Sequence, residues 1–117
     1  MDAQKRIERA LEAAVQRLET PKSPPLLAAA IRYSVFPGGA RVRPRLCLAV
    51  ARACGDDEPN VTDAAAAAIE FMHCGSLVHD DLPCFDNAAT RRGKPSVHMA
   101  YGESQAVLVG DALIVMA

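Results

Sequence analysis

The chain has 117 residues, of which 50% are apolar and 23% charged, and such a chain forms at most one domain. Its 14 acidic and 13 basic residues give a formal net charge of −1, so there is no basic excess and we expect no nucleic-acid partner. No apolar run reaches the roughly 20 residues that cross a bilayer, and the first ten residues lack the apolar segment of a signal peptide, so we expect a cytoplasmic protein with no membrane span.

The first part of the chain has the pattern of amphipathic helices. Apolar residues recur at i, i+3, i+4 and i+7 between residues 7 and 18, which predicts a helix that Pro21 ends. Ser23, directly before a proline, is a candidate N-cap for a second helix that reaches about Val35.

Two further helices follow the break at PGG, residues 37–39. The third is predicted from about Pro44 to Cys54, with Gly55 in the left-handed position after its end. The fourth is alanine-rich, is capped by Asn60 or Thr62 and extends as far as Leu82.

The rest of the chain is predicted as a loop and one more helix. A polar loop covers residues 86–102, and a fifth helix begins near Glu103. No stretch alternates well enough to be a strand, so the expected fold class is all-α. The final GDALIVMA is apolar and has no C-cap signal, so we expect residues 1–117 to be the N-terminal part of a longer helical domain, cut within a helix.

The four cysteines show neither CxxC spacing nor the density of a disulfide scaffold. They stand at positions 47, 54, 74 and 84, among apolar neighbours. We expect reduced, mostly structural thiols and no zinc site.

The stretch HDDLPCFDNAATRRG, residues 79–93, places three carboxylates and two arginines within fifteen positions. On a regular helix Asp80 and Asp86 would be about 600° apart and would face different sides. Pro83 lacks an amide proton and its ring collides with the carbonyl four residues earlier. Unwinding there lets Asp86 return to a position beside Asp80.

Two carboxylates held this close repel unless a cation lies between them, and hard oxygen ligands suit Mg²⁺. Mg²⁺ commonly completes its coordination with water and substrate phosphates. Arg91 and Arg92 can hold phosphate oxygens in a bidentate manner. His73 lies seven residues before Asp80, so both fall on one face of the helix, about 10 Å apart. Each of these residues alone is commonly a surface charge or a helix-capping residue. The carboxylate pair, the two arginines and the histidine together predict a site that binds a metal ion and a diphosphate.

Together these segments resemble the trans-polyprenyl diphosphate synthases, which include farnesyl and geranylgeranyl diphosphate synthases. LVHDDLPCFD resembles their first aspartate-rich motif, DDxxxxD, and RRGKPSVH the segment that follows it. GGARVRPRL is similar to their GGKRxRP motif, and GDAL to the start of the next helix. The resemblance covers nearly the whole chain from Ala30 onward, with the motifs in the family's order.

The resemblance implies the N-terminal portion of the isoprenoid-synthase helical bundle, and a transferase that condenses isopentenyl diphosphate with an allylic diphosphate. It implies Mg²⁺ as cofactor, a homodimer, and inactivity of this fragment alone, because the second aspartate-rich motif is missing. By position, Asp80 and Asp86 would bind Mg²⁺ with support from Asp81, and Arg91 would hold the allylic diphosphate. The isopentenyl diphosphate would be held by Arg43, His73 and Arg92.

The resemblance also suggests the product. In the family an aromatic side chain five positions before the motif closes the pocket for a fifteen-carbon product. Gly75 occupies that position and Ser76 the next, so we expect geranylgeranyl diphosphate, with farnesyl diphosphate the next candidate. Phe71 and Met72 are candidates for the next floor of the pocket.

The chain departs from the family pattern at three positions. Ala40 replaces the lysine of GGKR, which leaves Arg41 and Arg43 as nearby cations, and Ala88 and Ala89 replace two common acids. We expect lower affinity for isopentenyl diphosphate and intact metal binding.

Two other readings remain open. A non-catalytic subunit or fragment that pairs with a complete synthase is favoured by the three alanines. A metal-dependent phosphohydrolase is suggested by the His79-Asp80 dipeptide with His73, although these histidines do not share one helix face.

Overall fold

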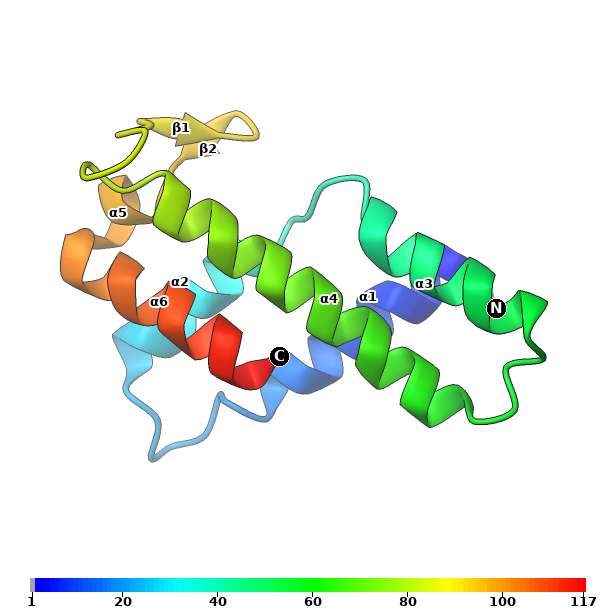
Figure 1. Ribbon diagram of the computed structural model, residues 1–117. Helices are drawn as coiled ribbons and strands as arrows, with labels where there is room; N and C mark the ends of the chain where they lie inside the picture. The colour runs from blue at the N-terminus through cyan, green and yellow to red at the C-terminus, as the bar shows by residue number, and fades with distance from the viewer. Residues whose placement is uncertain (1) are drawn as a thin grey trace.

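The computed structural model describes residues 2–117 and arranges them as six helices and one short hairpin, which confirms the all-α class (Figure 1). The longest helix, α4, runs through the middle of the molecule. It packs against α6 and α2 on one side and against α1 and α3 on the other. The elements are α1 Ala3–Gln16, α2 Pro25–Val35, α3 Val42–Ala53, α4 Pro59–Asp80, β1 Thr90–Arg91, β2 Lys94–Pro95, α5 Val97–Tyr101 and α6 Glu103–Met116.

The core forms where the apolar face of each helix meets α4. In α1 the buried residues recur at helical spacing, as its amphipathic pattern predicts: Ile7, Leu11 and Val15. From α4 the core takes several buried residues of its inner faces, among them Phe71, Cys74 and Val78. From α6 it takes Ala106, Val109 and Leu113. This packing fixes the direction of α4 and therefore the place where its acidic end emerges.

Several helix boundaries differ from the predicted ones. The Ser23 hydroxyl hydrogen-bonds to the Thr20 hydroxyl at 2.8 Å, and the N-cap of α2 is Pro24, with no side-chain cap. Thr62 lies inside α4 and donates to Asp56 Oδ1 at 2.8 Å. The long helix ends at Asp80 rather than Leu82. Proline and short polar side chains compete for a helix start, and longer-range partners decide between them.

The predicted loop between residues 86 and 102 contains two elements that the sequence pattern did not reveal. The strands β1 and β2 pair in antiparallel fashion, Thr90 with Pro95 and Arg91 with Lys94. Arg92 and Gly93 form the connection with φ of 53° and 76°, the left-handed pair typical of a tight hairpin turn. The short α5 follows directly and packs on α6.

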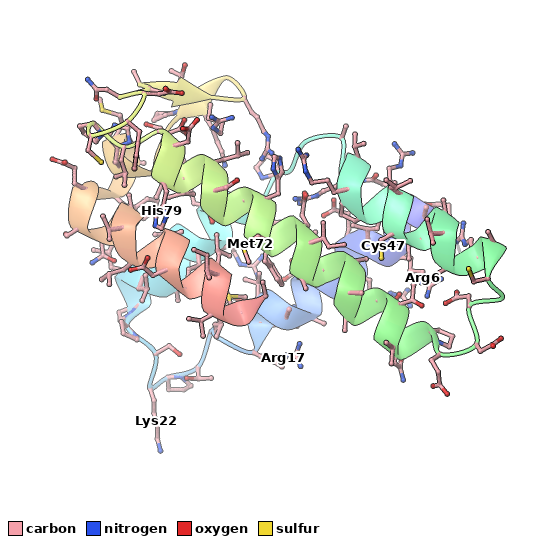
Figure 2. All side chains as sticks on the ribbon, in the orientation of Figure 1. Arg6, Arg17, Lys22, Cys47, Met72 and His79 are labelled. Carbon is pink, nitrogen blue, oxygen red and sulfur yellow. The ribbon has the colours of Figure 1, made fainter. Side chains whose placement is uncertain are left out.

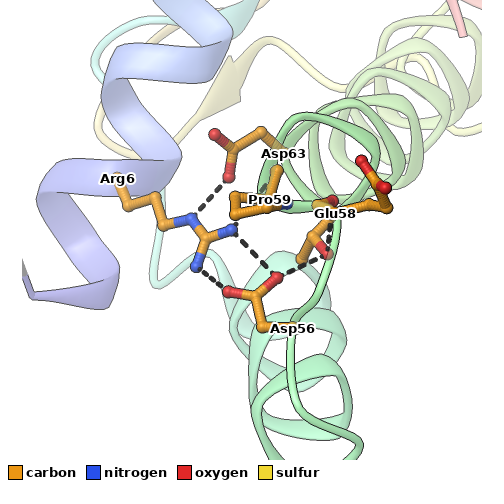
Figure 3. A network of polar contacts seen from close by, with 6 residues as sticks. Arg6, Asp56, Glu58, Pro59 and Asp63 are labelled. Carbon is orange, nitrogen blue, oxygen red and sulfur yellow. Dashed lines mark hydrogen bonds and ion pairs between the residues drawn. The ribbon is translucent and has the colours of Figure 1, made fainter.

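A polar network anchors α1 to the start of α4 (Figure 3). The Arg6 guanidinium donates to Asp56 Oδ2 at 2.7 Å, to Asp63 and to the Pro59 carbonyl at 3.3 Å. The bond from Arg6, with the Thr62 bond above, holds the pKa of the Asp56 carboxyl below its ordinary value. The network therefore holds the ends of α1, α3 and α4 together.

No helix within residues 2–117 combines the length and the apolar character that a bilayer span requires. All four cysteines are free thiols, as expected. Cys74 is buried in the core, and its burial raises the pKa of its thiol to about 11. Cys54 and Cys84 are exposed, so the expectation of structural thiols does not hold for these two.

Candidate functional site

The acidic segment folds back on the end of α4. Past Asp80 the chain turns, and the Asp86 amide donates to the Asp80 carbonyl at 3.0 Å. The Ala88 amide donates to the Asp81 carbonyl at 3.0 Å. Pro83, which cannot continue the helical hydrogen bonds, lies at the centre of this turn. The predicted return of Asp86 to Asp80 is confirmed.

The Asp80 and Asp86 carboxyls influence each other's charge. A hydrogen bond with Asp86, followed by repulsion from its charge, raises the pKa of Asp80 above its ordinary value, while Arg91 acts in the opposite sense. Both residues are exposed. No group of three or more His, Cys, Asp or Glu side chains gathers at one point within residues 2–117. An exposed carboxylate pair nevertheless fits Mg²⁺, which takes one or two protein carboxylates beside water and phosphate oxygens.

Asp81 plays a different part from its neighbours. It is buried, and both of its carboxylate oxygens accept from Arg91, Oδ2 from Nε at 2.7 Å and Oδ1 from Nη2 at 2.8 Å. This bidentate pair leaves the Nη1 edge of Arg91 for another acceptor. Asp81 therefore orients Arg91 beside the carboxylate pair.

The turn of the hairpin carries the second arginine toward the PGG loop. A Cβ placed on Gly39 would lie 3.2 Å from Arg92 Nε and 3.3 Å from Nη2, so the guanidinium rests directly over this glycine. The absence of a side chain at Gly39 makes this approach possible.

Arg43 and His73 extend the same cationic region. Arg43 Nη1 lies 3.4 Å from His73 Nε2. Burial, and then Arg43, lower the pKa of His73, and Arg92 and Arg91 act in the same sense. Because the guanidinium is always a donor, Nε2 acts as acceptor and the imidazole keeps its proton on Nδ1. The three residues predicted to share one anion thus lie in one electrostatic neighbourhood.

An apolar groove of about 550 Å³ begins at Arg43 and His73 and runs along α4. Two of its walls are Arg43 and His73, and the remaining lining comes mainly from Ala68, Ile69, Met72 and Ser76. Ser76 stands one helical turn before Asp80, so the groove opens near the acidic end of the helix. Figure 2 shows Met72 on the middle of α4.

The comparisons with known proteins fit this arrangement. The polyprenyl synthetase family model matches residues 24–117. The chain belongs to this family. It is 64% identical over 115 residues to a geranylgeranyl diphosphate synthase of Rhodobacter capsulatus, with 98% of this chain and 40% of the relative covered. The corresponding protein of Cereibacter sphaeroides is 60% identical, with 99% and 40% covered.

A solved structure agrees with the fold. The geranyltransferase of Legionella pneumophila superposes with a TM-score of 0.87 at 42% identity, over 97% of this chain and 39% of that one. The chain spans about 40% of the length of these two curated bacterial relatives.

Among the polyprenyl synthetase motifs, GGARVRP requires one correction. Arg41 is not available as a cation for substrate, because its guanidinium is buried and donates to Glu8 at 2.8 Å, to Glu70 at 2.7 Å and to the Val35 carbonyl at 2.8 Å. Its guanidinium also occupies the space where a side chain on Gly38 would lie. With Ala40 in place of the lysine, Arg43 is the one cation that this motif presents at the groove among the described residues.

The two residues expected to set product length face different ways. A Cβ on Gly75 would lie 3.2 Å from the Gly110 carbonyl oxygen and 3.3 Å from Leu113 Cβ, so Gly75 packs against α6 and does not leave an open pocket. Ser76, in contrast, lines the groove. Of the two candidates for the next floor, Met72 lines the groove and Phe71 is buried in the core.

His79, a metal ligand in the phosphohydrolase interpretation, has other partners in the structure. His79 faces α6, where its Nε2 lies 3.1 Å from the Val107 carbonyl and 3.5 Å from Asp111 Oδ1 (Figure 2). Its ring fills the space beside Gly110. His79 is therefore a packing residue between two helices.

The sequence patterns missed one buried pair beside the site. The Ser96 hydroxyl donates to the Ala88 carbonyl at 2.7 Å and lies 3.2 Å from His98 Nδ1. The Ser96 amide donates to the Ala89 carbonyl at 3.0 Å. His98 is 7% exposed, and its Nε2 finds no hydrogen-bond partner in residues 2–117. Ser96 stands at the N-cap of α5 and His98 in its first turn, where polar residues are common, so no sequence feature marked this pair.

Proposed function

We propose that the protein containing this chain is a Mg²⁺-dependent prenyltransferase that condenses isopentenyl diphosphate with an allylic diphosphate and releases geranylgeranyl diphosphate. The observation that carries the proposal is the juxtaposition of the Asp80–Asp86 pair, the Asp81-held Arg91 and an apolar groove that starts at Arg43 and His73. The names of the two bacterial relatives support the product.

The residues divide the work by chemistry. Asp80 and Asp86 would hold Mg²⁺, which when bound neutralises diphosphate oxygens and the charge that gathers on them as the allylic bond breaks. Arg91 presents its free edge to the same diphosphate. Arg43, His73 and Arg92 bind the isopentenyl diphosphate, and the groove excludes water from the carbocation.

The groove suggests how product length is set. A growing prenyl chain that leaves the diphosphate site along α4 passes Ser76 first and reaches Met72 one turn later. Ser76 is small and leaves room beyond the fifteen-carbon stage, while Met72 is a flexible apolar floor. We therefore assign the length-setting role to Ser76 and Met72 and no longer to Gly75.

The decisive experiment uses a chimera, because the chain spans 40% of its relatives. The chain is joined to the remaining segment of the Rhodobacter capsulatus relative, and incorporation of labelled isopentenyl diphosphate is measured. Asp80→Ala and Asp86→Ala are expected to lower turnover by several orders of magnitude, since each removes a ligand of an ion that acts in the transition state.

The matched control is Asp57→Ala, which removes an exposed carboxylate from the loop before α4. It should leave turnover unchanged. Near-normal turnover of Asp80→Ala would refute the metal-site assignment. An inactive but folded chimera would favour the alternative of a non-catalytic subunit, which pairs with a complete synthase.

Three finer expectations belong to the same proposal. We expect a homodimer, for which the exposed apolar residues of α6 offer a surface, and a cytoplasmic location. We also expect the 117-residue chain alone to show no turnover, because the proposed metal site lacks the family's second aspartate-rich motif.

A further inference from the structure

Lys94 of β2 is held at the end of α2 by groups that carry no negative charge. Its Nζ donates to the Tyr33 carbonyl at 2.7 Å and to the Phe36 carbonyl at 3.0 Å, and it lies 3.9 Å from the centroid of the Tyr33 ring. The last carbonyls of a helix lack intrahelical partners and favour a cation. The ammonium is thus fully occupied by two carbonyls and one aromatic face.

Tyr33 also contacts the hairpin and the helix that follows it. Its hydroxyl donates to the Pro95 carbonyl at 2.6 Å, and its ring meets Tyr101 of α5 edge to face at 5.3 Å. Burial, and then Arg92, lower the pKa of Lys94. Burying the charged ammonium of Lys94 therefore costs free energy, and its contacts with the carbonyl and the ring of Tyr33 offset this cost.

This arrangement of Lys94 determines the position of Arg92. Lys94 follows the Arg92-Gly93 turn directly, and Phe36 precedes Gly39 by three residues. One ammonium thus ties the hairpin that carries Arg92 to the loop on which the Arg92 guanidinium rests. A two-residue hairpin pairing has little stability of its own, so it needs such an anchor.

We propose that Lys94 is a positioning residue: it makes no contact with substrate, and it fixes Arg92 over Gly39 so that the guanidinium is preorganised to receive a phosphate group. The identity of that phosphate as part of isopentenyl diphosphate rests on the proposed function. The positioning itself concerns the ligand-free chain.

The first measurement needs no ligand. The order of the Arg92 Nε–H bond is followed by ¹⁵N relaxation in the unmodified chain, in Lys94→Met and in Lys22→Met. Lys22 is an exposed lysine that extends from the α1–α2 loop, far from the hairpin, and serves as the matched control (Figure 2). We expect Lys94→Met to make the Arg92 side chain mobile and Lys22→Met to leave it ordered. Unchanged order in a folded Lys94→Met chain overturns the proposal.

The second measurement titrates inorganic pyrophosphate into the same chains. Lys94→Met should weaken binding about tenfold, or about 1.4 kcal/mol. In an Arg92→Ala background it should have no further effect, because the lysine acts through the arginine. A full additional loss in that background would show that Lys94 binds the anion itself, which overturns the positioning role.

A milder variant guards against misfolding. Tyr33→Phe keeps the ring and the helix but removes the hydroxyl that holds Pro95, so it should loosen Arg92 in the same direction and to a smaller extent. If Lys94→Met does not fold, Lys94→Gln takes its place, since it loses the charge and the contact with the ring but keeps a hydrogen-bond donor, and a fully ordered Arg92 in that variant overturns the proposal. If the unmodified chain fails to bind pyrophosphate while Lys94→Met still frees Arg92, the diphosphate site is refuted and the positioning role is retained.

Discussion

At the scale of single residues, the Asp80–Asp86 pair is the feature whose charge state responds most directly to a ligand. The raised pKa of Asp80 means that the folded chain binds its proton more tightly than the unfolded chain does. Its contribution to stability is therefore present in acid, below the ordinary aspartate value, and is lost as pH rises through the raised value. At neutral pH the two carboxylates repel, and a cation between them relieves the repulsion.

Added Mg²⁺ is accordingly expected to raise the unfolding temperature at about pH 7.5 and to have little effect at about pH 3, below the ordinary aspartate pKa, where Asp80 carries its proton. Asp86→Asn should abolish the gain, and it should also return the pKa of Asp80 toward its ordinary value in a carboxyl NMR titration. Asp57→Asn is the control, and in this variant Mg²⁺ should still raise the unfolding temperature. An equal Mg²⁺ effect in the unmodified chain and in Asp86→Asn would place the ion elsewhere.

Arg92 permits a second residue-scale prediction, measured in the chimera. Arg92→Lys keeps the charge and loses the planar fork, so it removes at least one charge-assisted hydrogen bond. We expect the KM for isopentenyl diphosphate to rise about tenfold to a hundredfold and the KM for the allylic substrate to change little. Equal rises in both constants would mean that the two diphosphates are not divided between the arginines as proposed.

Sequence reasoning succeeded at this scale where a covalent constraint acts and failed where distant partners decide. Pro83 compels a break in the chain, so the meeting of Asp80 with Asp86 was predictable. The burial of Arg41 was not, because its partners Glu8 and Glu70 come from two other helices and no local pattern announces them. The Asp81–Arg91 pair has the same origin, since the hairpin that closes it went unpredicted.

At the scale of elements, the Arg41 cluster joins α1, α3 and α4 in the interior. Arg41→Met would leave Glu70 buried and without its cation, and we expect a loss of about 3–5 kcal/mol in the free energy of unfolding by urea. Arg32→Met is a close control, because Arg32 also lies over the Phe36 ring but pairs with Glu12 and Glu19 at the surface. The free energy of unfolding should fall much less in Arg32→Met than in Arg41→Met. Similar losses for both variants would contradict the burial argument.

The crossing of α4 and α6 supplies a second element-scale prediction. Gly75→Tyr forces a ring against the Gly110 carbonyl and Leu113, so it should lower the unfolding temperature without defining a shorter product. Ser76→Tyr instead fills the groove and should shift the chimera's main product from geranylgeranyl to farnesyl diphosphate by chromatography. The two adjacent variants control for each other, and shortening by Gly75→Tyr alone would restore the original assignment.

The helices themselves show what periodicity can establish. The apolar spacing between residues 7 and 18 was enough to place α1 and its buried face, because one stripe of side chains meets one neighbour. Along α4 the side chains meet four other helices, so spacing alone could not tell the groove side from the side of Gly75, which packs against α6. Strands of two residues and a helix of five are too short to show any period, and their stability comes from contacts such as Tyr33 with Pro95.

At the scale of the whole molecule, α3 and α6 each expose apolar side chains in addition to those of the groove on α4. On α3 an exposed stripe recurs at i, i+4 and i+8, formed by Val42, Leu46 and Val50. On α6 the exposed group is Val107, Leu108, Ile114 and Val115, with Val115 85% exposed. Leu108 and Val115 also border an apolar depression of about 420 Å³ between α2 and α6. Between the α3 and α6 surfaces, the one on α6 has protruding side chains that border a recess able to receive those of a second copy.

A two-fold dimer needs such a surface, because in an isologous interface each copy offers the projection and the recess at once. We therefore expect the 117-residue chain to self-associate, and light scattering after gel filtration should report at least a dimer. Val115→Glu should shift it toward the monomer, since a charge in the centre of an apolar interface stays unpaired. Leu46→Glu on α3 is the matched control and should leave the dimer in place. If Leu46→Glu loses the dimer and Val115→Glu keeps it, the interface lies on α3. If the unmodified chain is a monomer, the homodimer is removed from the proposal.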